Sequence, residues 1–335
     1  MKINRLLIFG FLLAQSFLFA QTKEVLFTID NHPYYTDEFV RVYNKNLDLV
    51  KDDSQKDLDK YLDLFVGYKL KVEKANKLGV THLSIMDHNT CASYLPKNIH
   101  LFDKYNGKLI KGVEISTYFS GKIIHLLVYD FELKPINDFL KKHFKSLKVV
   151  YKKEYDLIAK TLNRLGVIYE PHSKKDIKEE LWSAKYYYKY IVTNENIKKY
   201  FKGIKPSLNE LFWDHISNEK SPFFCDFKNV RVDIEKTIKA VKASKGKCFV
   251  AHSNLYGVNF KEKLDLLRDL GVDGFECFYP TYSKEYEFFL VSYCNENNLL
   301  KSAGSDYHGK FRQNKIATGI NGNLCKKYDV IKEWI

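Results

Sequence analysis

The sequence predicts an α/β protein built on a parallel sheet or barrel, because short apolar strands alternate with amphipathic helices along much of the chain. Hydrophobic residues make up 45% of its 335 residues, which is typical of a globular protein and excludes wholesale disorder. A second pattern concerns function: side chains that can bind metals recur just after apolar, strand-like runs. Strand–helix alternation predicts the fold, and the polar strand ends predict the chemistry.

The first 21 residues have the layout of a secretory signal peptide. Lys2 and Arg5 precede an apolar run over 6–19 that is short for a membrane span, and Ala20 offers a small residue for cleavage. This predicts a periplasmic or secreted protein with no membrane span after leader removal. The alternative is a cytoplasmic protein, because the six cysteines stand singly and several lie in apolar runs, as buried free thiols do.

Residues 22–79 are expected to form a largely helical N-terminal segment. A β-like run over 25–30 comes first, and a charged stretch with helical periodicity extends from Thr36 to about Leu78.

The αβ alternation occupies residues 80–335 and is interrupted once. Strands are expected over 81–86, 109–116, 123–131, 248–252, 274–278 and 299–304. Helices are expected over 232–244, 260–270 and 283–297. A lysine- and tyrosine-rich segment over about 133–226 has helical periodicity and few strand signals, which predicts a helical insertion.

The residues that follow the strands are of the types that ligate divalent metals. They are Asp87, His88, Glu114, His125, His252, Asp306 and His308. In parallel α/β folds such residues converge on one mouth, and imidazole with carboxylate suits Zn, Mn or Fe. Each residue alone has a simpler explanation, such as a helix cap or a turn. Together they favour a metal-dependent hydrolase, in which two metals about 3.5–4 Å apart clamp a phosphate.

The net charge of +13 has two interpretations. Most of the lysines can belong to a solvated basic surface. The functional alternative is a field that attracts phosphate-bearing substrates, including nucleotides and nucleic acid.

Five segments resemble, in order, the motifs of the PHP (polymerase and histidinol phosphatase) superfamily over about 79–335. They are LSIMDHNT, GVEIST, IIHLLVYDF, CFVAHSN and SAGSDYHG. The resemblance implies a distorted (β/α)7 barrel and a metal-dependent phosphoesterase. It implies that the metal ligands are His88, Glu114, His125, His252, Asp306 and His308. It also implies that metal-bound hydroxide attacks the phosphate while Asp87 or His308 assists proton transfer; it identifies no substrate-binding residue.

The insertion makes the chain similar to one branch of that superfamily, the nucleoside 3',5'-bisphosphate phosphatases and the RNase AM type of 5'-3' exoribonuclease. It contains LNRLG and, later, PFF, ahead of the His252 motif. The implied substrate is a phosphorylated small molecule, a nucleotide or an RNA 5' end. The run Ala251-His252-Ser253-Asn254 departs from that branch's Ala-His-Pro motif, which leaves the substrate preference open.

A second departure is that the chain contains no His-x-His motif. In the PHP superfamily this motif lies on the strand that normally opens the domain. Residues 24–79 instead resemble the N-terminal region of SurA/parvulin-type peptidyl-prolyl isomerases, without their catalytic domain, as in a fusion. The barrel is therefore expected to lack its usual first strand, and the site to hold fewer than the family's two or three metals. One possibility for replacing the missing ligands is that the strand over 25–29 fills the gap and places Asp30 and His32 near the mouth of the barrel. The alternative functions are a catalytically impaired remnant that binds metal or phosphate, and an exported chaperone-like binding protein.

Overall fold

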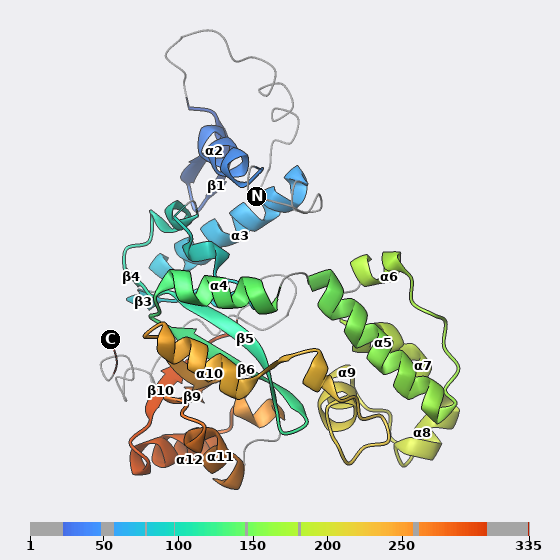
Figure 1. Cartoon of the computed structure of the whole chain (residues 1–335). Coiled ribbons are helices and arrows are strands. Elements are labelled where there is room, and N and C mark those ends of the chain that lie inside the picture. Colours follow the sequence, from blue (N-terminus) through green and yellow to red (C-terminus); the bar gives the residue numbers. More distant parts are fainter. Residues whose placement is uncertain are drawn as a thin grey trace. The chain divides into compact units, whose positions relative to one another are not determined.

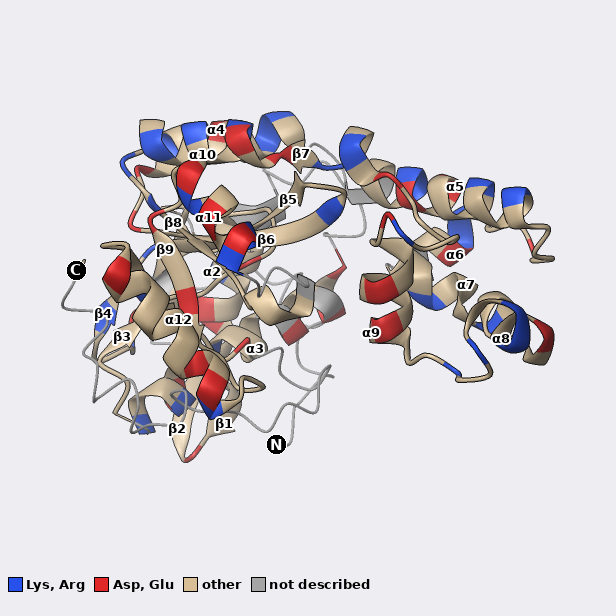
Figure 2. Cartoon of the chain, turned by 90° about the horizontal axis from the view of Figure 1, so that it is seen from below, with Lys and Arg blue, Asp and Glu red and all other residues tan. Residues whose placement is uncertain are grey.

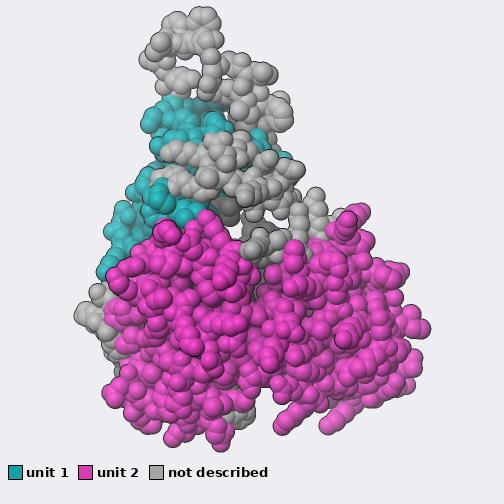
Figure 3. All heavy atoms as spheres, in the orientation of Figure 1, with its two compact units in different colours: residues 1–84, 92–110, 307–318 teal, residues 85–91, 111–306, 319–335 magenta. Residues whose placement is uncertain are grey.

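The computed structural model describes residues 23–47, 57–77, 79–96, 98–144, 147–179, 182–256, 261–306 and 334. The expected signal peptide over 1–21 and the candidate ligand His308 lie outside these residues. Within the described part of the chain, no helix is both long enough and apolar enough to cross a membrane. Contacts divide the chain into one compact unit of residues 1–84, 92–110 and 307–318 and another of residues 85–91, 111–306 and 319–335 (Figure 3).

The first unit begins with an antiparallel hairpin of β1 (Val25–Ile29) and β2 (His32–Tyr35). The helices α2 (Thr36–Leu47) and α3 (Leu58–Lys77) follow it (Figure 1). The expected β-like run is confirmed as β1, and helices occupy the charged stretch. Aromatic rings fill the small core, where Phe27 stacks on Tyr34 with ring centroids 5.0 Å apart.

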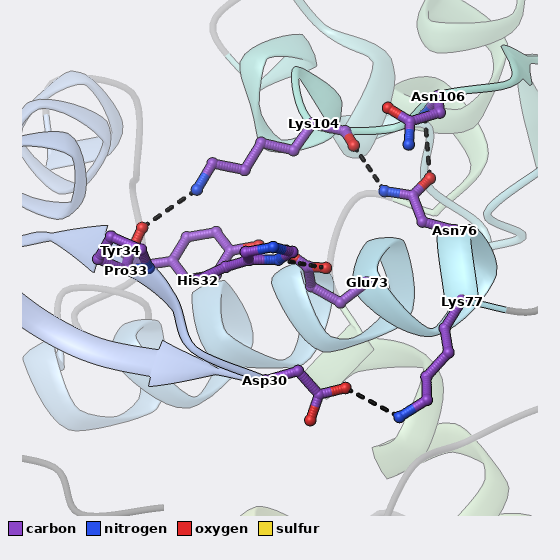
Figure 4. A network of polar contacts seen from close by, with 9 residues as sticks. All are labelled: Asp30, His32, Pro33, Tyr34, Glu73, Asn76, Lys77, Lys104 and Asn106. Carbon is purple, nitrogen blue, oxygen red and sulfur yellow. Dashed lines mark hydrogen bonds and ion pairs between the residues drawn. The ribbon is translucent and has the colours of Figure 1, made fainter.

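Polar contacts tie the hairpin to α3 within this unit (Figure 4). Nδ1 of His32 lies 3.2 Å from both carboxylate oxygens of Glu73, and the Tyr34 hydroxyl donates to the same carboxylate at 2.5 Å. Lys77 forms a 3.1 Å ion pair with Asp30 (Figure 4). Asp30 and His32, the two residues considered as substitutes for missing ligands, thus contact side chains of α3.

The strand expected over 81–86 is much shorter than predicted. Only β3 (His82–Leu83) forms, paired in parallel with the equally short β4 (Lys108–Leu109). The pairing of β3 ends opposite the end of β4, so the residues between Leu83 and Asp87 are not part of a strand.

The second unit contains a six-stranded sheet in the order β10-β9-β8-β6-β5-β7. Its strands are β5 (Gly112–Phe119), β6 (Lys122–Tyr129), β7 (Val232–Asp233), β8 (Lys247–Val250), β9 (Gly274–Phe278) and β10 (Leu300–Ala303). The strands β8, β9 and β10 are parallel, whereas β6 runs antiparallel to both β5 and β8. The expectation of an all-parallel sheet is therefore wrong at β6. The cause is local: Ser120 and Gly121, with φ of 46° and 79°, form a tight turn that folds β6 back on β5.

The architecture is mixed α/β with this sheet at its centre. Its helices are α4 (Leu133–His143), α10 (Ile234–Ala243), α11 (Lys261–Asp269) and α12 (Lys284–Glu296) (Figure 1). Ile136 of α4, Ile238 of α10 and Leu290 of α12 share one buried cluster with the strands. The closed (β/α)7 barrel stays a prediction, since the described strands follow one another from β10 to β7 in an open order.

The remaining helices of the insertion surround a core of their own. They are α5 (Leu147–Leu165), α6 (Lys174–Glu179), α7 (Ser183–Ile191), α8 (Asn194–Tyr200) and α9 (Leu208–Glu210), which continues into a π-helical turn over Leu211–Ile216. Tyr155, Tyr187 and Phe223 are fully buried in this core. Most of the charged residues along α5 are lysine or arginine (Figure 2).

The cysteines of the described residues are buried free thiols, as predicted. They are Cys91, Cys225, Cys248, Cys277 and Cys294, and Cys325 lies outside the described part. Burial raises the pKa of the Cys91 and Cys225 thiols to about 11. In a Cys325→Ser variant we therefore expect a thiol reagent such as Ellman's reagent to react slowly with native protein and rapidly in denaturant. Fast modification of several thiols in the native protein would contradict this burial.

Candidate metal centre

Three histidines surround one buried carboxylate in the second unit. Nδ1 of His125 lies 2.6 Å from Oε1 of Glu114, Nε2 of His88 lies 3.7 Å from Oε2, and Nε2 of His252 lies 3.8 Å from Oε1. The ring centroid of His125 is 5.4 Å from that of His88 and 5.4 Å from that of His252. Four side chains that are far apart in the sequence thus converge on one point.

Strand register brings two of these residues together. Ser116 pairs with His125 across β5 and β6, and Glu114 is two residues before Ser116, so Glu114 and His125 share a face of the sheet. They lie within their strands and not at the ends, which corrects the expectation from sequence. The hairpin explains this difference, because its turn, and not the site, sets where β5 and β6 end.

His88 and His252 reach the same point from irregular backbone beside the sheet. The backbone of residues 87–89 runs along β5: Glu114 donates its N–H to the Asp87 carbonyl at 3.2 Å, and Asn89 donates to the Glu114 carbonyl at 2.8 Å. His252 follows β8 by two residues, and Ala251 donates its N–H to the His125 carbonyl at 3.0 Å. Both histidines are therefore placed by main-chain pairing with β5 and β6.

The electrostatics of Glu114 and His125 favour the protonation states that bind metal. Burial alone would raise the pKa of Glu114, but the neighbouring histidines hold it well below its ordinary value, so the group is a carboxylate. Burial lowers the pKa of His125 to about 4, so its imidazole is neutral near pH 7. A carboxylate with neutral imidazoles is a donor set for Zn, Mn or Fe.

The residues present fit a divalent ion. One ligand atom each from His88, Glu114 and His125 lies within 4.8 Å of the others. Nδ1 of His125 and Oε1 of Glu114 lie 2.6 Å apart, and this buried oxygen has no hydrogen-bond partner among the described residues. A cation bound by this oxygen would satisfy it, since a buried polar atom without a hydrogen bond is costly.

The shifted pKa of His125 predicts a pH effect on the stability of the metal-free protein. Between about pH 6.5 and 4 the unfolded chain binds a proton at this residue that the folded chain does not, so its contribution makes stability fall as pH falls. The raised pKa of His252 makes stability change with pH in the opposite direction. The test therefore compares wild type with a variant that lacks the His125 imidazole. We expect the free energy of unfolding, measured in urea, to fall more from pH 7 to pH 5 in wild type than in His125→Gln. Equal losses in the two proteins would contradict the burial of a neutral His125.

The other sequence-predicted site residues are placed as follows. Asp306 comes three residues after β10 and accepts a hydrogen bond from the Tyr279 hydroxyl at 2.9 Å. Asp87 directly precedes His88, and its carbonyl pairs with the N–H of Glu114. The ligand roles of the set, and the proton-transfer roles of Asp87 and His308, stay predictions.

Sequence reasoning missed Glu276. This residue lies on β9, is only 3% exposed, and accepts the backbone N–H of His252 on Oε2 at 2.8 Å. The available signal was one carboxylate within the apolar strand Gly-Phe-Glu-Cys-Phe, because glutamate is almost never fully buried without a partner.

Comparison with known proteins places these features in context. No family model matches the chain. It is 26% identical over 266 residues to a 5'-3' exoribonuclease of Haemophilus influenzae, covering 78% of this chain and 90% of that protein. A crystal structure of a proposed metal-dependent phosphoesterase from Bifidobacterium adolescentis is similar with a TM-score of 0.53 and 18% identity, over 80% of this chain and 91% of the other.

A second solved structure is an amidohydrolase from Chromobacterium violaceum with bound sulfate and no metal. It is similar with a TM-score of 0.51 and 14% identity, over 72% of this chain and 81% of the other. At these identities the two structures show a shared fold. The curated relative and both solved structures carry the names of hydrolases.

Proposed function

We propose that this protein is a divalent-metal-dependent phosphoesterase that hydrolyses phosphate esters of nucleotides or short RNA. The observation that carries the proposal is the convergence of His88, His125 and His252 on the Glu114 carboxylate. The name of the Haemophilus relative supports a nucleic-acid substrate, and the net charge of +13 suits a phosphate-bearing one.

The roles in this proposal follow from the placement of each group. His88, Glu114 and His125 hold the ion, and His252 lies beside them on Oε1 of Glu114. The bound metal would supply Lewis-acid polarisation of the phosphate and an activated water. Asp306 is oriented by the Tyr279 hydroxyl, and Asp87 or His308 assists proton transfer.

We also propose the finer ancestry that the motifs suggest. The barrel-related part belongs to the branch of the 3',5'-bisphosphate phosphatases and RNase AM, and residues 24–79 derive from an isomerase-like N-terminus joined near Gly79. The absence of His-x-His from the sequence favours fewer than three metals.

The test combines metal analysis with turnover. Full-length protein is loaded with Mn²⁺, desalted and analysed for metal, then assayed on bis-p-nitrophenyl phosphate, adenosine 3',5'-bisphosphate and a 5'-phosphorylated oligoribonucleotide. We expect bound metal and hydrolysis of at least one substrate, lost in His125→Ala and retained in His32→Ala, whose imidazole contacts Glu73 in the first unit. Metal without turnover would support the impaired remnant, and the absence of both would overturn the proposal.

A further inference from the structure

Glu276 is a buried carboxylate that the predicted ligand set does not include. We propose that Glu276 is a positioning residue: it holds His252 in a strained backbone conformation and directs its imidazole toward Glu114. The effect of Glu276 on metal affinity rests on the proposed function, whereas its effect on the conformation of His252 does not.

The backbone of His252 is strained. Its φ is 25°, in the left-handed region that a residue with a Cβ rarely adopts. Such a conformation is unfavourable and persists only where surrounding structure enforces it. The N–H of this residue donates to Oε2 of Glu276 at 2.8 Å, and the carboxylate lies in the sheet, so a rigid acceptor fixes the strained residue.

The imidazole of His252 is oriented between two carboxylates. Nδ1 of His252 lies 3.6 Å from Oε2 of Glu276, while Nε2 lies 3.8 Å from Oε1 of Glu114. The two carboxylates therefore flank opposite nitrogens of one ring that is only 8% exposed. In metal sites, a carboxylate on the far nitrogen of a histidine fixes the ring orientation and its tautomer.

The Glu276 carboxylate also occupies space beside the end of β10. A Cβ placed on Gly304 would lie 2.3 Å from Oε1 of Glu276, closer than real contacts allow. Position 304 therefore suits glycine, because the carboxylate fills the space of a side chain. Gly304 precedes the candidate ligand Asp306 by two residues, so the same carboxylate borders the segments that carry His252 and Asp306.

These contacts predict different effects for two substitutions. Glu276→Gln keeps a carbonyl oxygen that can accept the His252 N–H, whereas Glu276→Ala removes every acceptor. Loss of such a supporting residue typically costs about 10–100-fold in metal affinity. We expect Glu276→Ala to weaken Mn²⁺ or Zn²⁺ binding by about that factor, and Glu276→Gln to recover most of the loss.

A double-mutant cycle separates positioning from general damage. If Glu276 acts through His252, then Glu276→Ala should add no further loss of metal affinity in a His252→Ala background. The matched control is Glu287→Ala, which removes another buried glutamate of the same unit, one whose carboxylate oxygens have no hydrogen-bond partner among the described residues. Additive losses in the cycle, or an equal loss in Glu287→Ala, would overturn the assignment.

Hydrogen–deuterium exchange of the metal-free full-length protein tests the inference without metal. The readout is the peptide over 247–256, whose His252 amide is bonded to Glu276. We expect faster exchange there in Glu276→Ala, near wild-type exchange in Glu276→Gln, and no change in Glu287→Ala. Unchanged exchange in Glu276→Ala would refute the positioning role. If the wild type binds no metal but the exchange pattern holds, the proposed function fails and the positioning role stands.

Discussion

Replacing Glu114 by glutamine is expected to lower the affinity for Mn²⁺ or Zn²⁺ by at least about 100-fold, more than the loss of a supporting residue outside the ligand set. Glu114 is the group on which His88, His125 and His252 converge, and its carboxylate is the negative charge at their centre. Glutamine has nearly the same size but removes this charge and presents an amide N–H₂ that cannot ligate a metal. The measurement is competition for the ion against a chromophoric chelator at pH 7.5.

Two further variants make this result specific. Glu285→Gln is the matched control, because Glu285 is an exposed residue in the first turn of α12 and the same chemical change there should leave metal affinity unchanged. His125→Ala should lose affinity comparably to Glu114→Gln, since these two residues make the closest approach in the site. Wild-type affinity in Glu114→Gln would show that the ion, if bound, lies elsewhere.

Gly274→Ala is expected to destabilise the second unit by about 3 kcal/mol, at the upper end of the usual cost of overpacking. A Cβ on Gly274 would lie 1.9 Å from the Leu300 carbonyl oxygen and 3.0 Å from the Phe249 ring. The Leu300 carbonyl belongs to the backbone of β10, which pairs with β9, so it cannot move without breaking that ladder. The measurement is urea unfolding followed by circular dichroism.

The control for this substitution is Gly67→Ala. Gly67 lies within α3, its added Cβ would meet no atom within 4 Å, and its φ is not positive. Alanine is favoured over glycine inside a helix by about 0.5–1 kcal/mol, so this variant should be as stable as wild type or more so. Equal stability of Gly274→Ala and Gly67→Ala would contradict the close strand packing at β9.

Elements with strong local patterns were predictable from the sequence. The helix expected over 283–297 is α12 (Lys284–Glu296), where Ser283 accepts the N–H of Tyr286 as an N-cap. The strand expected over 274–278 is β9 itself, because a run of five buried residues between Asp273 and Tyr279 has no competing helical period. Such elements are determined by residues close to one another in the chain.

Elements that depend on a distant partner were not predictable to the same degree. The strand expected over 81–86 is reduced to His82–Leu83, since its pairing partner β4 is only two residues long. The direction of β6 depended on the turn at Ser120 and Gly121, whose left-handed backbone reverses the chain. Strand pairing is a property of two segments, so the composition of one segment does not fix its length or direction.

For the candidate site, the sequence by itself determined the chemical types, namely imidazoles and carboxylates next to apolar strands. Only the tertiary structure decided which of them meet. It joined Glu114 to His88, His125 and His252 through the register of β5 and β6, and it placed Glu276 behind His252. The physical reason is that ligand chemistry belongs to single side chains, whereas a metal site requires distances of a few ångströms that only the packed sheet sets.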